Sequence, residues 1–408
     1  MTAREYILSI LKQVIYEGGY ASLLLREKRN QFSNEDNAFI SETVYGTLRN
    51  YALLNKQWKD YAKHSVRRDT IILLNMSIYH LFFLDKIPTY AVINEAVELS
   101  QKRDKAFVNA VLRKVSEKGL VKNEEDTLEA LSENTSHPLW ILQMWKAHYG
   151  EDIAKKIAQF NQTRSIVYGR INTIKCDKNE LLEDEKVHFV NDYVFTYDGI
   201  LTSTDYFKEG KVLIQDLSSS LIPTLLDVEK GMNVLDACSA PGTKTQEIAM
   251  LMNNDGEIIA QDIYEKRVQL IEHLMLKTGV SIVKTVVQDS SVLNEEYVNQ
   301  FDRVLLDAPC SGLGDLRHKA EIRFHLKPEN IDELVSLQSK LLDVNANYVK
   351  GNGILLYSTC TLNKKENEKQ IQSFLKKHQE FELLEEKTLF SFIENSDGFY
   401  YAKMRKKG

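Results

Sequence analysis

The sequence predicts a multidomain protein in three successive parts: an all-α helical bundle, a small α+β segment, and an α/β domain built on a parallel sheet. The first part repeats apolar residues at helical spacing and holds only four of the 18 glycines. The second mixes helix and strand patterns. In the third, apolar strands alternate with helical segments, which favours a parallel sheet with helices on both faces. With 408 residues, the chain is long enough for two or three domains.

Residues 1–135 are expected to form the helical bundle. Their apolar positions recur three and four residues apart, as on one face of a helix: Ile7, Leu8, Leu11, Val14 and Ile15, and again Ile71, Leu74, Ile78, Leu81 and Phe82. The polar and acidic stretch 122–134 is predicted to be a linker.

Residues 136–210 are expected to form the α+β connector. A helix is predicted to begin after Pro138 and to run towards Gly150. Alternating apolar and polar residues predict one strand over 165–172 and a second over 188–195.

Residues 211–408 are expected to form the α/β domain. Its strands are predicted at 232–237, 256–261, 282–288, 302–306 and 353–358.

Composition limits the class of protein. Hydrophobic residues make up 43% and charged residues 27%, as in ordinary globular proteins. No apolar stretch approaches the roughly 20 residues of a membrane helix, and the start, with Glu5, does not resemble a secretory signal. Four cysteines without CxxC spacing predict neither a disulfide framework nor a structural zinc. We therefore expect a cytoplasmic protein with no metal and no membrane partner.

The net charge is −6, from 52 basic and 58 acidic residues. Dedicated nucleic-acid binders usually carry a basic excess. Any contact with RNA or DNA must therefore use a local basic patch.

The stretch Asn233–Thr245 predicts a ligand site. An apolar strand ends in Asp236, a turn of small residues follows, and a helix begins. Such a turn lets a ligand lie against backbone and a helix N-terminus at the carboxyl edge of a sheet. The GxxxxGK[ST] pattern of a P-loop is absent.

Two further acids follow the next two strands. Asp262, twenty residues after Gly242, is placed to bind the hydroxyls of a ribose, and Asp289 to meet an adenine amino group. Each acid alone is more simply a surface carboxylate at a strand end. Together, in register, they favour a nucleoside cofactor.

Two cysteines, Cys310 and Cys360, come just past the carboxyl ends of the fourth and fifth strands. A free cysteine is usually a small buried hydrophobe, and that interpretation suits Cys176 and Cys238. The loops at this edge are where doubly wound folds hold ligands, and thiolates there are activated by a lysine or a helix N-terminus. We therefore expect two catalytic thiols.

These motifs closely resemble those of the RNA cytosine-5 methyltransferases, which use S-adenosylmethionine. The matching stretches are 234–245, Asp307–Gly314 with its Pro-Cys pair, and Tyr357–Thr361 with its Thr-Cys pair, followed by Glu366-Asn367-Glu368. The first part, with Phe107–Arg113, resembles the NusB-like domain fused to the bacterial small-subunit ribosomal RNA member, and Asp397–Lys403 resembles the family's last strand.

The resemblance implies a Rossmann-like class I methyltransferase domain of seven strands and an RNA-recognition-like connector. It also implies the catalytic roles: Cys360 attacks carbon 6 of cytosine, Cys310 assists product release, Asp307 hydrogen-bonds the exocyclic amine or ring nitrogen 3, and Lys244 lowers a thiol pKa or holds the base. The thiolate adduct makes carbon 5 nucleophilic. A target base must be unstacked, so a loop or splayed nucleotide is expected.

The cofactor residues implied by the resemblance surround the turn. The methionine part is expected against Cys238, Ser239, Ala240, Pro241, Gly242, Thr243 and Lys244, with Asp262 at the ribose, Asp289 at the adenine and Asp307 nearest the sulfonium. Arg267 matches a basic position of the family, although a solvated helix charge explains it equally well.

The sequence departs from the family at two places. Thr243 replaces the second glycine of the family's APGGKT turn, which strains the loop only if that position needs a positive φ. The stretch Arg317–Phe324 lacks the proline of the family's RRxPD motif. It keeps its basic character, so RNA contact stays its expected role.

Small-subunit ribosomal RNA, free or in a partly assembled subunit, is the implied partner of a monomeric enzyme. The candidate RNA contacts are Arg103, Lys105, Arg113, Lys114, Arg164, Arg170 and the stretch 317–323.

The same motifs allow four other functions to be compared with this one. An exocyclic-amine methyltransferase would carry an aromatic residue where Cys310 stands, and a DNA cytosine-5 methyltransferase would not need Cys360. A non-catalytic RNA-binding or ribosome-assembly factor, and a cytosine-5 methyltransferase of another RNA, stay open.

Overall fold

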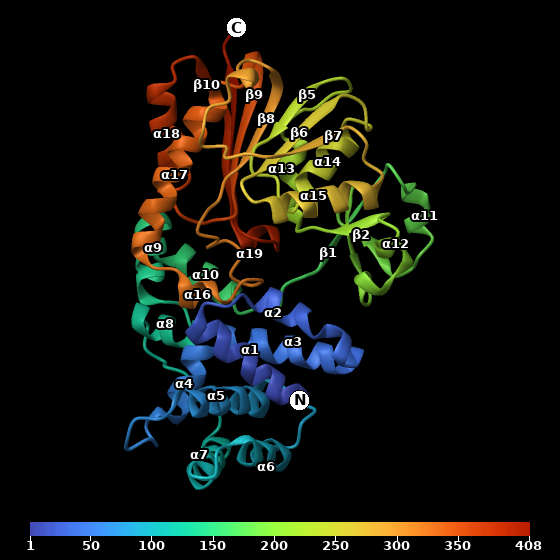
Figure 1. Cartoon of the computed structure of the whole chain (residues 1–408). Helices are drawn as coiled ribbons and strands as arrows, with labels where there is room; N and C mark the ends of the chain where they lie inside the picture. Colours follow the sequence, from blue (N-terminus) through green and yellow to red (C-terminus); the bar gives the residue numbers. More distant parts are fainter. The chain divides into compact units, whose positions relative to one another are not determined.

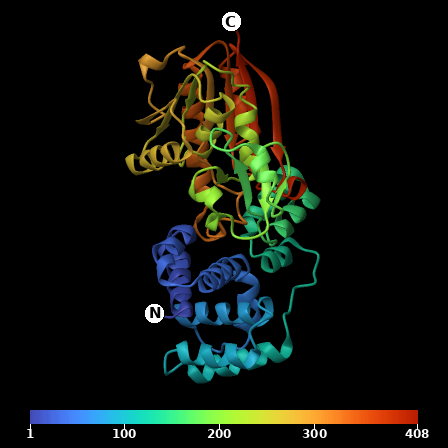
Figure 2. The same cartoon turned by 90° about the vertical axis from the view of Figure 1, so that its right-hand side faces the viewer.

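The computed structural model describes all 408 residues. The chain divides into two compact units (Figures 1 and 2). Unit 1 contains Met1–Arg164 together with Leu316–Leu326, and unit 2 contains Ser165–Asp315 and Lys327–Gly408. No helix is long and apolar enough to cross a membrane.

Unit 1 is helical throughout. Its helices are α1 (Ala3–Glu17), α2 (Ala21–Glu27), α3 (Asn34–Arg49), α4 (Tyr51–Lys59), α5 (Arg68–Phe83), α6 (Thr89–Leu99), α7 (Lys105–Lys118), α8 (Leu128–Thr135), α9 (Leu139–Tyr149), α10 (Glu151–Phe160) and α16 (Ile322–His325). Helix α5 is buried along most of its length, as a helix with few charges should be. It packs against α1, α3, α4, α6 and α7.

The predicted linker over 122–134 is wrong in its second half. Thr127 is the N-cap of α8 and its hydroxyl accepts a hydrogen bond from Ala130 N. The helix packs against α4 and α9. A good cap and burial of one face make a helix of a stretch whose composition suggested a linker.

The predicted boundaries at 135/136 and 210/211 differ from the division into units. Helices α9 and α10 lie within unit 1, whereas the small sheet belongs to unit 2. The boundaries of the three fold types stay predictions.

The first part of unit 2 is a four-stranded antiparallel sheet in the order β2-β3-β1-β4. Its elements are β1 (Tyr168–Ile171), α11 (Lys178–Leu182), β2 (Val187–Phe189), β3 (Val194–Tyr197), α12 (Asp205–Lys208) and β4 (Val212–Ile214). This βαββαβ succession is the ferredoxin-like arrangement that RNA-recognition folds share.

The single strand predicted over 188–195 is wrong, because the chain turns back there. Strands β2 and β3 form a hairpin around Asn191. The side-chain oxygen of Asn191 accepts hydrogen bonds from Tyr193 N at 2.9 Å and Val194 N at 2.8 Å. This local turn by an asparagine side chain interrupts the alternating pattern.

The larger sheet has seven strands in the order β10-β11-β9-β8-β5-β6-β7, the number implied by the resemblance. The strands are β5 (Asn233–Asp236), β6 (Glu257–Asp262), β7 (Val283–Val287), β8 (Phe301–Asp307), β9 (Val349–Thr359), β10 (Phe381–Leu389) and β11 (Phe399–Lys406). Strand β11 runs antiparallel to its neighbours β9 and β10, while β5 to β9 pair in parallel.

Helices cover both faces of this sheet, as predicted (Figure 1). On one side lie α13 (Leu217–Thr224), α14 (Thr243–Leu251) and α15 (Glu265–Thr278), and on the other α17 (Pro328–Ala346) and α18 (Glu368–Lys377). Neighbouring strand residues alternate between two cores: Leu305 and Leu356 face one, Val304 and Leu355 the other. Because β5, β6, β8 and β9 pair in parallel, their carboxyl ends lie at the same edge of the sheet.

Candidate active site

The two cysteines of the Pro-Cys and Thr-Cys motifs lie side by side. Strands β8 and β9 are parallel neighbours with Asp307 paired to Ser358, and each cysteine follows within three residues of that pair. The Sγ atoms of Cys310 and Cys360 are 3.4 Å apart. The expectation that both thiols sit past neighbouring strand ends is confirmed.

Beside the thiols, Asp307 connects Lys244 and Ser358. Lys244 Nζ is 2.8 Å from Asp307 Oδ2, and Ser358 Oγ donates to Asp307 Oδ1 at 2.7 Å. The Lys244 ammonium also lies 5.4 Å from the centre of the Phe399 ring. Burial favours a neutral amine, but the adjacent Asp307 carboxylate outweighs burial and raises the pKa of Lys244. The lysine is therefore a fixed cation.

The Cys310 thiol is a weak acid in its contact with Cys360. Its hydrogen bond with Cys360, together with burial, raises the pKa of Cys310 well above the ordinary value. Burial also raises the pKa of Cys238, which is half-buried, and raises that of the buried Cys176 to about 11. Cys310 thus keeps its proton at neutral pH.

The turn after β5 is held by backbone geometry. Ser239 N and Ser239 Oγ both donate to Gln261 O at 2.9 Å. Gly242 has φ 100°, which a side chain disfavours, and is the N-cap of α14. Thr243 is the first residue of that helix. The positive φ thus falls on Gly242, and threonine is harmless at the departing position.

Asp262 and Arg267 lie against this turn. Asp262 ends β6, and its Oδ2 is 3.2 Å from Arg267 Nη1. Arg267 Nη2 donates to Ala240 O at 3.1 Å. The arginine therefore links the turn to the carboxylate. Asp289, two residues after β7, accepts hydrogen bonds from Ser291 N at 2.9 Å and Ser291 Oγ at 2.7 Å.

Asp236 lies beneath the turn with an unusual carboxyl group. It is buried, accepts a hydrogen bond from Thr245 Oγ1 at 2.7 Å on one oxygen, and has no partner for the other. Burial raises the pKa of Asp236 to about 7. A buried acceptor without a donor fits a ligand that brings one.

Comparison with known proteins gives the family. The model of 16S rRNA methyltransferase RsmB/F matches residues 223–405, that of the NusB family residues 1–117, and that of the RsmF/B-like ferredoxin-like domain residues 137–188. The "Probable ribosomal RNA small subunit methyltransferase B" of Bacillus subtilis is 34% identical, with 100% of this chain and 99% of that protein covered. The chain belongs to the RsmB/F family of 16S rRNA methyltransferases.

Solved structures agree with this RsmB/F assignment. The crystal structure of PH0851 has a TM-score of 0.82 and 25% identity, covering 100% of this chain and 99% of that one. A methyltransferase homolog from Pyrococcus horikoshii has a TM-score of 0.62 and 29% identity, covering 69% of this chain and 99% of that one.

A buried carboxylate braces the cysteine loops in this RsmB/F chain. Glu366 is 0% exposed. One oxygen accepts from Ser311 Oγ at 2.6 Å and Asn363 Nδ2 at 2.8 Å, and the other from Ser311 N at 2.9 Å and Gln338 Nε2 at 3.1 Å. Gln338 also donates to Pro309 O at 2.9 Å. Both neighbours of Cys310 are therefore held through Glu366. In the sequence, Glu366 is visible only as part of the Glu366-Asn367-Glu368 stretch, which gives no sign of this structural role.

Two glycines bring the same loops close together. Gly314 N donates to Cys360 O at 3.0 Å, and Gly398 N donates to Gly314 O at 2.9 Å. A Cβ on Gly314 would lie 1.9 Å from Gly398 O. Both glycines stand in stretches that resemble the family, 307–314 and 397–403, but the sequence alone assigns them no role.

Three of the candidate RNA contacts are wrong, because their side chains are buried: Arg170, Arg317 and Arg323. Arg170 donates to Gln215 Oε1 at 2.8 Å and lies 3.5 Å from the buried Glu247. Arg323 donates to the carbonyls of Arg49 and Asn161, and Arg317 stacks over Phe160 at 4.3 Å. These arginines stabilise the interior of each unit. The exposed candidates remain predictions: Arg103, Lys105, Arg113, Lys114, Arg164 and Lys319.

Proposed function

We propose that this RsmB/F member transfers a methyl group from S-adenosylmethionine to carbon 5 of a specific cytidine in 16S rRNA, through a covalent cysteine–cytosine adduct. The observation that carries the proposal is the pair of thiols, with sulfurs 3.4 Å apart, beside the Lys244–Asp307 ion pair. Methylation of an amine or a hydroxyl needs no second thiol.

Carbon 5 of cytosine is a poor nucleophile while the ring stays aromatic. In the proposed reaction, the Cys360 thiolate forms a bond to carbon 6 and the electron pair of the 5,6 double bond moves to carbon 5. Carbon 5 would then be nucleophilic enough to take a methyl group from a bound sulfonium, whose methyl–sulfur bond would break to leave a neutral thioether. Loss of the carbon 5 proton to a base returns a pair to the ring and breaks the sulfur–carbon 6 bond. The Lys244 cation, whose charge interacts with Cys360, favours the thiolate.

The roles of Asp307 and Cys310 follow from the groups that surround them. Asp307 is a carboxylate fixed by Lys244 and Ser358. It is suited to accept a hydrogen bond from the exocyclic amine or from protonated nitrogen 3 as charge develops. Cys310 keeps its proton because its pKa is raised. It can therefore protonate the Cys360 sulfur as the adduct breaks down, which supports a role in product release.

The residues around the turn fit the cofactor, which supplies the methyl group as a sulfonium. Asp262 and Asp289 offer carboxylate acceptors at the ends of neighbouring strands. The partnerless oxygen of Asp236 lies beneath the turn, and Gly242 lets the backbone approach closely. We propose that residues 238–244 hold the methionine part, Asp262 the ribose and Asp289 the adenine, with Arg267 positioning Asp262.

The test is a denaturing gel of Cys310→Ser with 16S rRNA and S-adenosylmethionine, beside the Cys310→Ser/Cys360→Ser double variant. A shifted protein–RNA band is expected from the single variant, because the adduct forms and breaks down slowly. Its loss in the double variant assigns the bond to Cys360. Failure of the folded single variant to give any band would overturn the covalent mechanism.

Cys360→Ser alone is expected to fold and to abolish turnover. Methylation by this variant would contradict the role of Cys360 as nucleophile. Methylation of another RNA in preference to 16S rRNA would favour a cytosine-5 methyltransferase of that RNA. Binding of 16S rRNA without any methylation would favour a non-catalytic ribosome-assembly factor. We further propose that the enzyme is a cytoplasmic monomer that acts on free rRNA or on a partly assembled subunit.

A further inference from the structure

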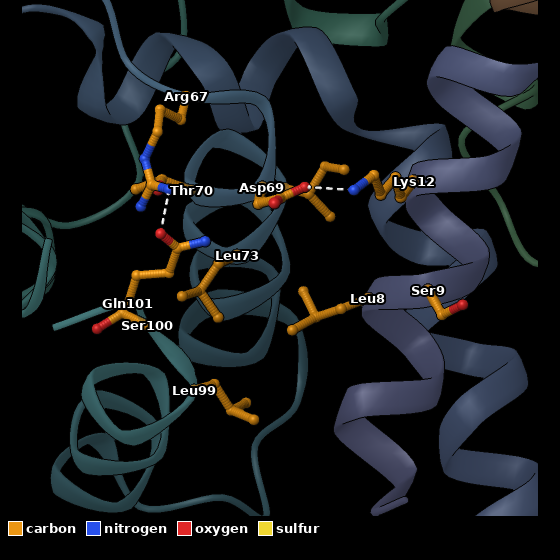
Figure 3. Close-up of a pocket in the computed structure, with 11 residues that line it drawn as sticks. Leu8, Ser9, Lys12, Arg67, Asp69, Thr70, Leu73, Leu99, Ser100 and Gln101 are labelled. Atoms are coloured by element: carbon orange, nitrogen blue, oxygen red, sulfur yellow. Dashed lines mark hydrogen bonds and ion pairs between the residues drawn. The ribbon is translucent and has the colours of Figure 1, made fainter.

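Two cavities in unit 1 differ in their charge: in one the charged side chains are paired with each other, and in the other basic side chains are in excess. The first, of about 320 Å³, is shown in Figure 3 between α1, α5 and the end of α6. Its charges are satisfied internally: Lys12 is 3.0 Å from Asp69, and Arg67 pairs with Asp104 and Gln101. This cavity has no charge left for a ligand.

The second cavity, of about 230 Å³, is lined by residues of α3, α4, α5 and the stretches around α8 and after α10. Three of its lining side chains are basic, Arg49, Lys122 and Arg164, and one is acidic, Glu42. It therefore holds an excess of positive charge within a chain whose net charge is −6.

Arg49 is the central group of this cavity. The residue is 8% exposed, its guanidinium takes part in no ion pair, and its Nε has no hydrogen-bond partner. Burial lowers the pKa of Arg49; the nearby Tyr79 and Glu42 raise it in part, and the charges of Arg164 and Arg317 lower it again. A buried cation without a counter-ion is costly. Glu42 is the one acid in the cavity and pairs with Arg164 rather than with Arg49, so the cavity has room for a further anion.

Glu42 does not supply that anion. Its Oε1 already accepts a hydrogen bond from Tyr79 OH at 2.7 Å and lies 3.1 Å from Arg164 Nη2. The carboxylate holds the exposed Arg164 at the rim instead. Two guanidinium groups, one buried and one at the mouth, thus serve the same cavity.

The remaining lining fits a nucleotide. The rings of Tyr79 and Phe83 are stacked, with centroids 5.0 Å apart and planes 10° apart. Gln162 presents a buried amide oxygen without a partner. Tyr79 is the buried ring of this pair, so the partly exposed Phe83 provides the aromatic surface. Such a surface beside an amide acceptor suits an unstacked base, and guanidinium groups suit its phosphate.

We infer that this cavity binds one phosphate of the rRNA strand through Arg49 and Arg164, with the adjoining nucleotide against Phe83 and Gln162. The inference rests on the proposed rRNA substrate and adds an anchor in unit 1 to the site in unit 2. The anchor contributes to binding the RNA and not to the chemical step.

The test measures binding of 16S rRNA over a range of salt concentrations for Arg49→Gln and Arg164→Gln. Arg26→Gln is the matched control, because Arg26 is exposed on α2 and lines neither cavity. Loss of a phosphate contact should weaken binding by about tenfold for Arg49→Gln and by roughly threefold for Arg164→Gln. The slope of log K against log salt should fall by about 0.7 to 0.9. Arg26→Gln should change neither quantity.

Thermal unfolding separates a binding defect from a folding defect. If Arg49→Gln does not fold, the test uses Arg164→Gln, whose site is exposed. An rRNA affinity and a salt slope of Arg164→Gln equal to those of Arg26→Gln would overturn the inference. Tight binding of inorganic phosphate or CMP that depends on Arg49, with rRNA affinity unchanged, would also overturn it in favour of a small-anion site.

Methylation at saturating rRNA should proceed at the wild-type rate in both variants. If the wild type methylates nothing, the proposed function fails, and the binding slopes still report on the cavity.

Discussion

Replacement of Glu366 by glutamine tests whether one buried carboxylate positions the thiol loops. The four hydrogen-bond donors around Glu366 need four acceptor positions on two oxygens. A glutamine amide turns one oxygen into a donor. In one orientation its nitrogen faces Ser311 N and Gln338 Nε2, and in the other it faces Asn363 Nδ2. In either case a buried donor meets a donor.

The cost can be worked from these contacts. Hydrogen bonds to a charged group contribute about 1.5–3 kcal/mol each, and a buried donor without an acceptor costs about 1–3 kcal/mol. With at least one such donor and weaker remaining bonds, we expect a loss of about 2–4 kcal/mol. For a unit of this size, each kcal/mol lowers Tm by about 2–4 °C. The Tm of unit 2 should therefore fall by roughly 4–16 °C.

The effect on chemistry follows from the contacts at Pro309 and Ser311, which flank Cys310. Looser flanking residues should slow breakdown of the adduct more than they weaken cofactor binding. Calorimetry measures Tm, and single-turnover methylation measures the rate. Glu368→Gln is the control, because Glu368 accepts a hydrogen bond only from Thr388 Oγ1, at 3.1 Å. If Glu366→Gln matches this control in Tm and in rate, the bracing role is refuted.

Two further predictions concern the same edge of the sheet. Gly314→Ala should lower the free energy of unfolding by about 2–5 kcal/mol and slow adduct formation, because its Cβ would lie 1.9 Å from Gly398 O and disturb two backbone hydrogen bonds. The control is Gly351→Ala, whose Cβ meets nothing nearer than 3.5 Å and which should change Tm by no more than about 2 °C. Equal Tm values for the two variants in calorimetry would contradict the close approach. Burial raises the pKa of Asp236 from its ordinary 3.8 to about 7 in the folded state, so the folded state binds more protons between these values and stability falls as pH rises from about 4 to 7. The whole effect is at most about 4 kcal/mol, and Asp236→Asn should remove it, whereas an unchanged pH profile of thermal unfolding would show that the carboxyl titrates normally.

Much of the fold could be predicted from the sequence, because the relevant patterns are local. The strand ends at Asp236, Asp307 and Ser358 are marked by apolar runs followed by polar residues, and the parallel pairing then brings Cys310 and Cys360 together. The hairpin at Asn191 was missed because one asparagine side chain outweighs an otherwise continuous alternation.

The buried charges could not be predicted in the same way. Arg170 was expected on the surface, yet its partner Glu247 lies on a helix far along the chain. Glu366 likewise acquires its role only when Ser311 and Gln338 arrive from other elements. A charged residue with an ordinary sequence context carries no signal of the polar groups that folding brings to it.

Residues 316–326 belong to unit 1 although the residues on both sides of them belong to unit 2, and this limits where the chain can be cut into fragments. Ala320 is part of the core of unit 1, Phe324 packs edge-on against Tyr51, and Arg323 donates to Arg49 O. A fragment ending at Arg164 lacks all three, and a fragment beginning at Ser165 carries them without their neighbours. During synthesis, unit 1 is complete only after Leu326 has left the ribosome, when most of unit 2 has already been made. Expression of residues 1–164 alone should therefore give a unit 1 that lacks part of its own core.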